Sequence, residues 1–212
     1  MIINLDQLRT FMESDAQDFE ELFRKNRYLL KAPGCSDEDI KFIEKNIGNI
    51  PSVYKKIIQK YDFFKKIIGF FSLSPIPSGG QNMADSIINA NIHEPFLSRE
   101  FLDKKSFIWI GSNNDYTVYV SKGSEEFKED EIVLIDEEII GNEDNPRPED
   151  NQIHPLAKDF EQFLIVAGNL NEIHREIKED NSNWEEKKNE FIGRLKILGV
   201  DERYHKAWLN VF

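Results

Sequence analysis

Cysteine is nearly absent from this chain of 212 residues, in which Cys35 is the only one. A single cysteine excludes an internal disulfide and a metal site built from several thiolates. No apolar run reaches the roughly 18 residues that a membrane-spanning helix needs. Asp6 and Arg9 interrupt the start too early for the apolar core of a signal peptide. We therefore expect a protein of the reducing cytoplasm that holds no cofactor and no metal.

Positive charge is also in short supply. The 39 acidic residues outnumber the 27 lysines and arginines, which gives a formal net charge of −12. Phosphate backbones and anionic membrane surfaces repel such a chain. We therefore expect neither nucleic acid nor a membrane as a partner, whereas a basic protein fits the charge.

Sequence motifs for catalysis are missing as well. The chain has no G-x-S-x-G, Walker A or G-x-G-x-x-G motif, each of which marks a specific chemistry. Its four histidines, at 93, 154, 174 and 205, are too scattered for a helical metal-binding pair. A hydrolase that uses His154, with Asp159 nearby, is one hypothesis; a solvated loop histidine is the alternative that we favour. We therefore expect a protein that is not an enzyme.

Apolar residues are plentiful, at 40% of the chain, so a substantial core is expected. Helical spacing of apolar side chains predicts helices over 15–31, 36–47, 51–61 and 156–170, a broken helical stretch over 83–102, and a helical C-terminus. Ser36 has the features of an N-cap. Gly48 suits the residue after a helix, and Pro51 suits the first turn of the next one.

Four short segments rich in β-branched and aromatic residues predict strands. The first is "IIGFFSLSP" at 67–75, followed by "SFIWIG", "YTVYVS" and "EIVLID" at 106–111, 116–121 and 131–136. A meandering antiparallel sheet is the economical arrangement. The polar, proline-containing stretch 141–155 predicts a loop.

Negative charge is concentrated in one region. Residues 125–150 hold twelve acidic residues against Lys128 and Arg147, a net charge of −10 out of the chain's −12. This region can be a docking surface that steers a cationic protein by long-range attraction, or a solvated loop that keeps the neighbouring strand from pairing at its edge. The predicted partner-binding residues are Glu125, Glu126, Glu129, Asp130, Glu131, Asp136, Glu137, Glu138, Glu143 and Asp144.

A series of short motifs resembles one family in order and spacing. Glu44, Ile47 and Gly48 match E-x-x-[IL]-G, and Ile50, Pro51 and Tyr54 match [IL]-P-x-x-[YF]. A strand ending in Ile110 and Gly111 follows, then a helix with Phe160, Phe163 and Leu164, where Asp159 stands in the place of a common serine. Over about residues 36–168 the chain thus resembles the SUKH superfamily, with its Smi/Knr-type domain, to which the yeast cell-wall-assembly regulator and many bacterial immunity proteins belong.

Two departures from the family pattern stand out. "YDFFKK" replaces the glycine pair and asparagine that usually follow the second helix, and "SNND" replaces a common Gly-Asp. The chain therefore resembles a divergent member of the family. The resemblance implies an α+β fold, a mixed domain with helices packed on a predominantly antiparallel sheet. We expect an N-terminal helical segment at 1–35, the SUKH-like domain at 36–168 and a C-terminal helical extension at 169–212, all in one compact unit.

The resemblance also implies a function. The leading hypothesis is a non-enzymatic protein-binding module, an immunity protein that neutralises a polymorphic toxin, in this family often a nuclease, by occluding its active site. The acids of 125–150 would pair with the lysines and arginines that the toxin uses to bind phosphate. The alternative is a regulatory or scaffold protein of the same family without a toxin partner.

Overall fold

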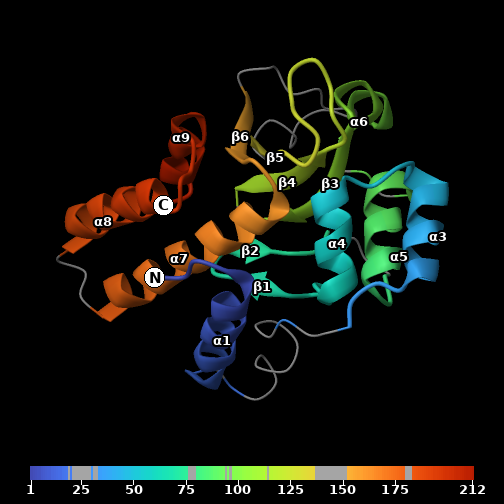
Figure 1. Ribbon diagram of the computed structural model, residues 1–212. Coiled ribbons are helices and arrows are strands. Elements are labelled where there is room, and N and C mark those ends of the chain that lie inside the picture. The colour runs from blue at the N-terminus through green and yellow to red at the C-terminus, as the bar shows by residue number, and fades with distance from the viewer. Residues whose placement is uncertain are drawn as a thin grey trace.

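The computed structural model describes residues 1–18, 20, 30, 33–75, 80–93, 95, 97–113, 115–136, 152–179 and 183–212 (Figure 1). Most of the helix predicted at 15–31 lies outside these residues. The helices are α1 (Leu5–Asp15), α3 (Asp37–Ile47), α4 (Ser52–Lys60), α5 (Met83–Ile88), α6 (Arg99–Lys105), α7 (Phe160–Glu179), α8 (Trp184–Ile197) and α9 (Glu202–Asn210). A 3-10 turn (Ala16–Asp18) follows α1, and a π-helical segment, η2 (Asn89–His93), follows α5.

The strands of the described residues form one sheet in the order β1-β2-β3-β4-β5-β6, and every neighbouring pair is antiparallel. The predicted meander and the α+β fold class are confirmed. The segment 67–75 forms two short strands rather than one, because Gly69 turns the chain between them at φ 58°. The strands are β1 (Ile67–Ile68), β2 (Phe71–Ser72), β3 (Phe107–Ser112), β4 (Tyr116–Ser121), β5 (Ile132–Asp136) and β6 (Ile153–Ala157).

Strand β6 corrects the sequence prediction. Residues 153–155 were expected in a loop and Leu156 at the start of a helix, but Ile153–Ala157 pairs with β5, and α7 begins only at Phe160. Pro155 hides the strand in the sequence because proline lacks the N–H that a ladder needs. At the edge of the sheet, where β6 lies, this N–H is not required on the outer side.

The two helix ends at the hinge of α3 and α4 follow local rules. Ser36 caps α3 with a reciprocal pair of hydrogen bonds: its N–H donates to Asp39 at 2.8 Å, and its Oγ accepts from the Asp39 N–H at 3.1 Å. Gly48 follows α3 and has a φ of 82°, a positive value that glycine adopts at little cost. The predicted helix end at Gly48 is thus confirmed. Pro51 stands at the N-cap of α4, one position before the first turn where it was expected.

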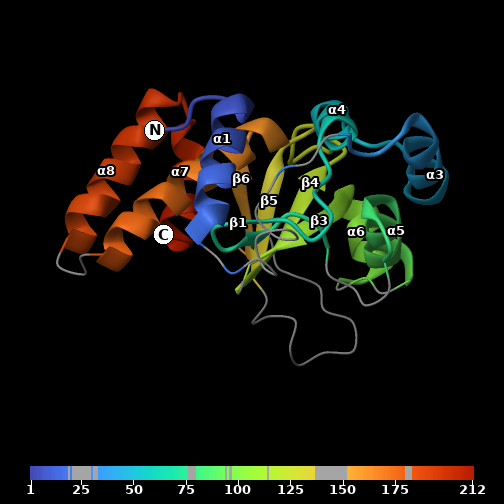
Figure 2. The ribbon, with the colours of Figure 1, turned by 90° about the horizontal axis from the view of Figure 1, so that it is seen from below.

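Both faces of the central strands are buried, because alternate residues of β3, β4 and β5 belong to different apolar clusters. The larger cluster joins the sheet to α1, α3, α4, α5, α7, α8 and α9. In Figure 2, α1, α7 and α8 lie to one side of the strands and α3, α4 and α5 to the other. The smaller cluster lies under α6 and the connection from β4 to β5. Strand residues of the larger cluster include Ile108, Ile110, Val118, Val120, Ile132 and Leu134; those of the smaller include Phe107, Trp109, Tyr119, Val133 and Ile135.

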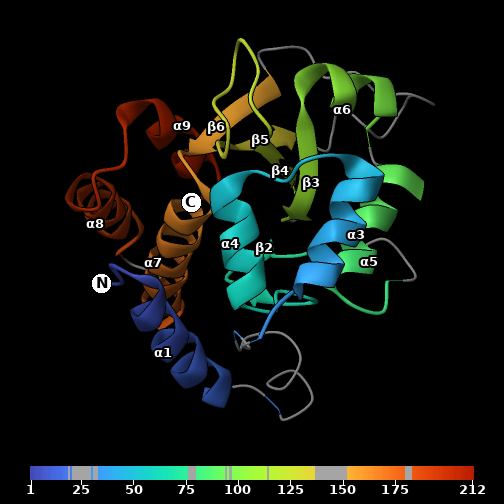
Figure 3. The same ribbon diagram turned by 45° about the vertical axis from the view of Figure 1, so that its right-hand side comes forward.

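The C-terminal helices share this core. Phe191, Leu195 and Trp208 are fully buried in the larger cluster, together with Ile2 and Leu8 from the other end of the chain. Helix α7 is continuous through residue 168. Helices α3 and α5 pack side by side at the other end of the molecule from α8 (Figure 3). The segments before 36 and after 168 therefore contribute to the same core as the middle of the chain.

Candidate partner-binding site

The loop from β4 to β5, residues 122–131, carries five of the ten predicted partner-binding residues (Figure 1, yellow). Phe127 anchors this β4–β5 loop: its ring is 8% exposed and lies 5.2 Å from the ring of Phe107. The Ser124 hydroxyl accepts the Phe127 N–H at 3.1 Å, which closes the turn. With Phe127 directed inward, the carboxylates on either side of it are directed outward.

Glu125, Glu126 and Glu129 are the exposed acids of the loop. Glu126 pairs with Lys105 of α6 at 2.7 Å, and Lys128 adds an exposed positive charge. Glu125 and Glu129 form no ion pair within the described part of the chain. These two carboxylates are therefore free to meet a cationic partner.

Asp130 lies in the predicted set but is buried, with 7% of its surface exposed. Its carboxylate accepts hydrogen bonds from the N–H groups of Val53 and Tyr54, at 2.9 and 3.0 Å, and from the Ser52 hydroxyl at 3.1 Å. The two N–H groups belong to the first turn of α4, which lacks intrahelical acceptors and for which Pro51 has no capping side chain. Asp130 is thus a cap for α4 and does not belong to an exposed surface, which corrects the prediction.

Glu131 is also not an exposed residue, because none of its surface is accessible to solvent. Its carboxylate accepts the Tyr204 hydroxyl at 2.9 Å, lies 2.8 Å from the Arg203 guanidinium and accepts the Lys128 N–H at 3.0 Å. Burial and this hydrogen bond to Glu131 raise the pKa of Tyr204, so the phenol stays protonated and donates. Glu131 therefore attaches α9 to the sheet.

The remaining predicted acids lie at and beyond the end of β5. Asp136 is half-buried, opposite Tyr116 of β4. The other four, Glu137, Glu138, Glu143 and Asp144, lie outside the described residues. The structure thus brings Glu125, Glu126 and Glu129 together on one loop and gives Asp130 and Glu131 internal partners.

The residues considered for chemistry are in sheltered positions. His154 is half-buried on β6 opposite Leu134, and burial, reinforced by the charge of Lys206, lowers its pKa. Burial raises the pKa of the Cys35 thiol to about 12, so the nucleophilic thiolate is scarce at neutral pH. Cys35 lines a hollow of about 230 Å³, and a second hollow of about 300 Å³ lies between the start of α7 and the end of α8.

Metal and membrane sites can be assessed over the same residues. The described ranges contain no group of three or more histidine, cysteine, aspartate or glutamate side chains that could hold a metal ion. Among these residues, we find no helix with the length and apolar character needed to cross a membrane.

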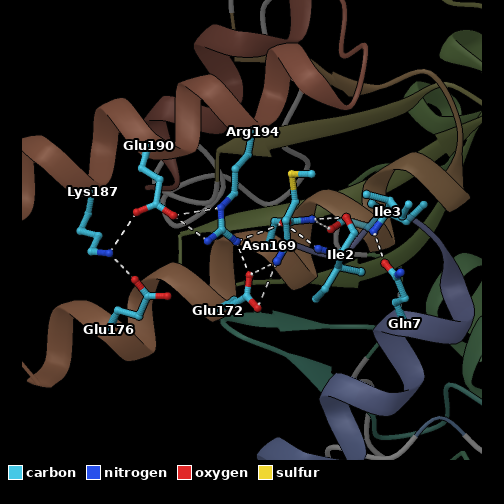
Figure 4. A network of polar contacts seen from close by, with 11 residues as sticks. Ile2, Ile3, Gln7, Asn169, Glu172, Glu176, Lys187, Glu190 and Arg194 are labelled. Atoms are coloured by element: carbon cyan, nitrogen blue, oxygen red, sulfur yellow. Dashed lines mark hydrogen bonds and ion pairs between the residues drawn. The ribbon is translucent and has the colours of Figure 1, made fainter.

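A polar network that the sequence analysis missed joins the two ends of the chain (Figure 4). Arg194 of α8, 9% exposed, pairs with Glu172 and Glu190 and donates to the Asn169 side chain at 3.2 Å. Asn169 in turn donates to the Ile2 carbonyl at 2.7 Å and accepts the Ile2 N–H at 3.1 Å. Although burial alone would raise it, the hydrogen bond to Arg194 lowers the pKa of Glu172. The network holds α7, α8 and the N-terminal segment together.

The matching residues of the family motifs have structural roles. Glu44 reaches across the hinge to Lys55, 2.9 Å away, while Ile47, Ile50 and Tyr54 are buried. At Gly111 a side chain is excluded, since a Cβ atom there would lie 2.3 Å from the Ser72 carbonyl oxygen. The motif therefore marks a hinge and a close approach of strands rather than a reaction.

Asp159, which stands where a serine is common, lies at the start of α7. Its side chain accepts the Gln162 N–H at 2.8 Å, and its carbonyl accepts the Phe163 N–H, so it caps α7. Phe160, Phe163 and Leu164 then point into the core.

Comparison with known proteins agrees with this reading of the motifs. The comparison with curated proteins finds no match for this chain. The sequence model of the SMI1 / KNR4 family (SUKH-1) matches residues 34–165, more than half of the chain. This range contains the hinge, all six strands of the described sheet and the start of α7. The chain therefore belongs to the SMI1 / KNR4 family (SUKH-1), which includes immunity proteins and Smi1/Knr4 regulators.

Proposed function

We propose that this chain is a non-enzymatic, cytoplasmic immunity protein that binds a cationic toxin domain and occludes its active site. Its family includes immunity proteins, and SUKH domains typically bind protein partners. The observation that carries the proposal is the β4–β5 loop, which presents Glu125, Glu126 and Glu129 at the surface.

The mechanism is steric and electrostatic. Exposed carboxylates attract a basic surface over a distance and pair with its lysines and arginines on contact. A nuclease uses such cations to bind phosphate, so carboxylates in their place exclude the substrate. In this proposal the acids that follow β5, Glu137, Glu138, Glu143 and Asp144, extend the surface.

The charge proposal is tested by reversing the three exposed acids of the loop together. If a toxin domain is encoded next to this gene, its association with Glu125→Lys/Glu126→Lys/Glu129→Lys should be about tenfold or more slower at low salt than with the wild type, because rim charges act mainly on the association rate. The matched control reverses three exposed acids elsewhere, Asp6, Asp115 and Glu161, with the same change in net charge. Equal association rates and salt dependence for the two triple variants would contradict the acidic surface.

The immunity role has a separate test. Cells that express the neighbouring toxin should survive when they also express this chain, and the two proteins should purify together. A family member that acts as a regulator or scaffold is the alternative, and it predicts no adjacent toxin gene and no rescue. Rescue that persists in the loop variant would keep the immunity role and place the interface elsewhere.

A further inference from the structure

Four aromatic rings from distant parts of the sequence meet at one end of α7. The His174 ring lies 4.9 Å from that of Phe70 in the β1–β2 turn and 5.2 Å from that of Phe212. The Trp184 ring, at the start of α8, lies 6.3 Å from His174 and 4.9 Å from Phe212. We call Phe70, Trp184 and Phe212, with His174 beneath them, the aromatic patch.

The patch is open to solvent although its base is buried. His174 is 8% exposed, whereas Phe70 is 46% and Trp184 45% exposed. Single exposed apolar side chains are ordinary on a protein surface, but large ones that converge from separate segments indicate a contact surface. Within the described residues, no cation lies over the ring of Phe70 or Trp184, although Lys65 lies 4.9 Å from the ring of Phe64.

Unpaired carboxylates follow Trp184 in the first turn of α8. Glu185 and Glu186 follow Trp184, are exposed and form no ion pair with any described residue. The other acids of this region differ: Glu176 and Glu190 are paired with Lys187, as Figure 4 shows. Acidic residues in the first turn stabilise a helix, and here they also add unpaired negative charge to the turn that carries Trp184. Lys188 is the nearby positive charge on the same helix.

We propose that the aromatic patch, with Glu185 and Glu186, is a second docking surface that takes an arginine-bearing segment of a partner protein. A guanidinium is attracted to the face of an aromatic ring and pairs with carboxylates through several N–H donors. The start of α8 provides an exposed aromatic ring, Trp184, and two unpaired carboxylates. The start of α8 lies well away from the β4–β5 loop in all three ribbon views (Figures 1, 2 and 3), so this surface is independent of the proposed function.

The tryptophans make the patch accessible to experiment. Trp109 and Trp208 are buried, at 8% and 0% exposure, so Trp184 is the exposed indole. We would follow its indole N–H by NMR, assigned through its loss in Trp184→Phe, while adding acetyl-Gly-Arg-Gly-Arg-Gly-amide. We expect a saturable shift of this signal. The same peptide with citrulline in place of arginine keeps the shape but lacks the charge. Its apparent affinity should be lower by a factor of about five or more.

Two variants locate the contact. Phe70→Ser should remove most of the shift at Trp184, and Glu185→Gln/Glu186→Gln should weaken peptide affinity by about threefold to tenfold. Phe42→Ser is the matched control, since Phe42 is an exposed aromatic residue of α3, 51% accessible, away from the patch. Equal shifts with the arginine and citrulline peptides, or an unchanged shift in Phe70→Ser, would overturn the proposal. Trp184-dependent binding to phosphatidylcholine vesicles without a response to the peptide would overturn it in favour of a lipid contact.

Discussion

The carboxylate of Asp130 accepts the backbone N–H of Val53 at 2.9 Å, so a residue of the β4–β5 loop caps a helix that begins far earlier in the chain. We expect Asp130→Ala to lower the free energy of unfolding by about 2–3 kcal/mol, since it leaves buried donors of α4 without a charged acceptor. Urea denaturation measures this loss. Glu129→Ala, at the exposed neighbouring position, should change stability by less than about 0.5 kcal/mol, and an equal loss in both variants would contradict the cap.

The link between Glu131 and Tyr204 predicts a coupled pair. Tyr204→Phe should cost about 1.5–3 kcal/mol, because it removes a hydrogen bond to a buried charged group. In a Glu131→Gln background the same substitution should cost about 1 kcal/mol or less. A double-mutant cycle by urea denaturation gives the coupling, and additive losses would show that the hydroxyl contributes through packing alone.

Tyr54 predicts the opposite outcome for the same substitution. Its hydroxyl is fully buried and has no hydrogen-bond partner among the described residues. Tyr54→Phe should therefore leave stability unchanged or raise it by up to about 1 kcal/mol, since it removes a buried polar atom that lacks a partner. Thermal unfolding beside Tyr204→Phe provides the comparison. A loss as large as that of Tyr204→Phe would reveal an internal partner, such as a bound water.

Alanine substitution at two glycines should change the free energy of unfolding in opposite directions. At Gly111 a Cβ atom would meet the Ser72 carbonyl oxygen at 2.3 Å, so Gly111→Ala should cost about 1–3 kcal/mol by forcing β2 and β3 apart. In the interior of α8, a Cβ atom at Gly193 meets nothing within 4 Å, so Gly193→Ala should stabilise by about 0.5–1 kcal/mol. Circular dichroism melts of the two variants would test the pair, and a stable Gly111→Ala would rule out the close approach.

His154 makes stability depend on pH. Burial and the charge of Lys206 lower its pKa in the folded state, so below the unfolded value of about 6.5 the unfolded chain binds more protons. The favourable contribution is complete above that value and declines as the pH falls through the folded pKa. His154→Gln should therefore lose less stability than the wild type between pH 7.5 and pH 5. Urea midpoints at both pH values measure the difference, and parallel profiles for the two proteins would contradict the assignment.

Features encoded within a few residues could be predicted from the sequence. The cap at Ser36 depends on Asp39, three residues away, and Gly48 lies directly after the helix that it ends. The strands at 107–112, 116–121 and 132–136 stand out by composition. In β6, by contrast, Pro155 breaks the usual strand pattern, and only pairing with β5 determines its structure.

The candidate site shows the same division. The sequence places Glu129, Asp130 and Glu131 in one acidic run, yet it cannot show that α4 and α9 supply partners for the last two. Asp130 finds its donors 76 to 78 residues earlier, and Glu131 finds a hydroxyl 73 residues later. Neighbouring acidic residues that look alike in the sequence therefore differ in role, and only tertiary contacts decide which are buried and which are exposed.

The three anchors of the β4–β5 loop have a consequence for the cost of association. Asp130 is fixed to α4, Glu131 to α9, and Phe127 is held in the smaller apolar cluster. A surface segment fixed in this way has little backbone freedom left to lose, so a partner that contacts Glu125 and Glu129 would spend little of its interaction energy on ordering the loop. Most of the electrostatic attraction would then remain to speed the encounter and to prolong the complex.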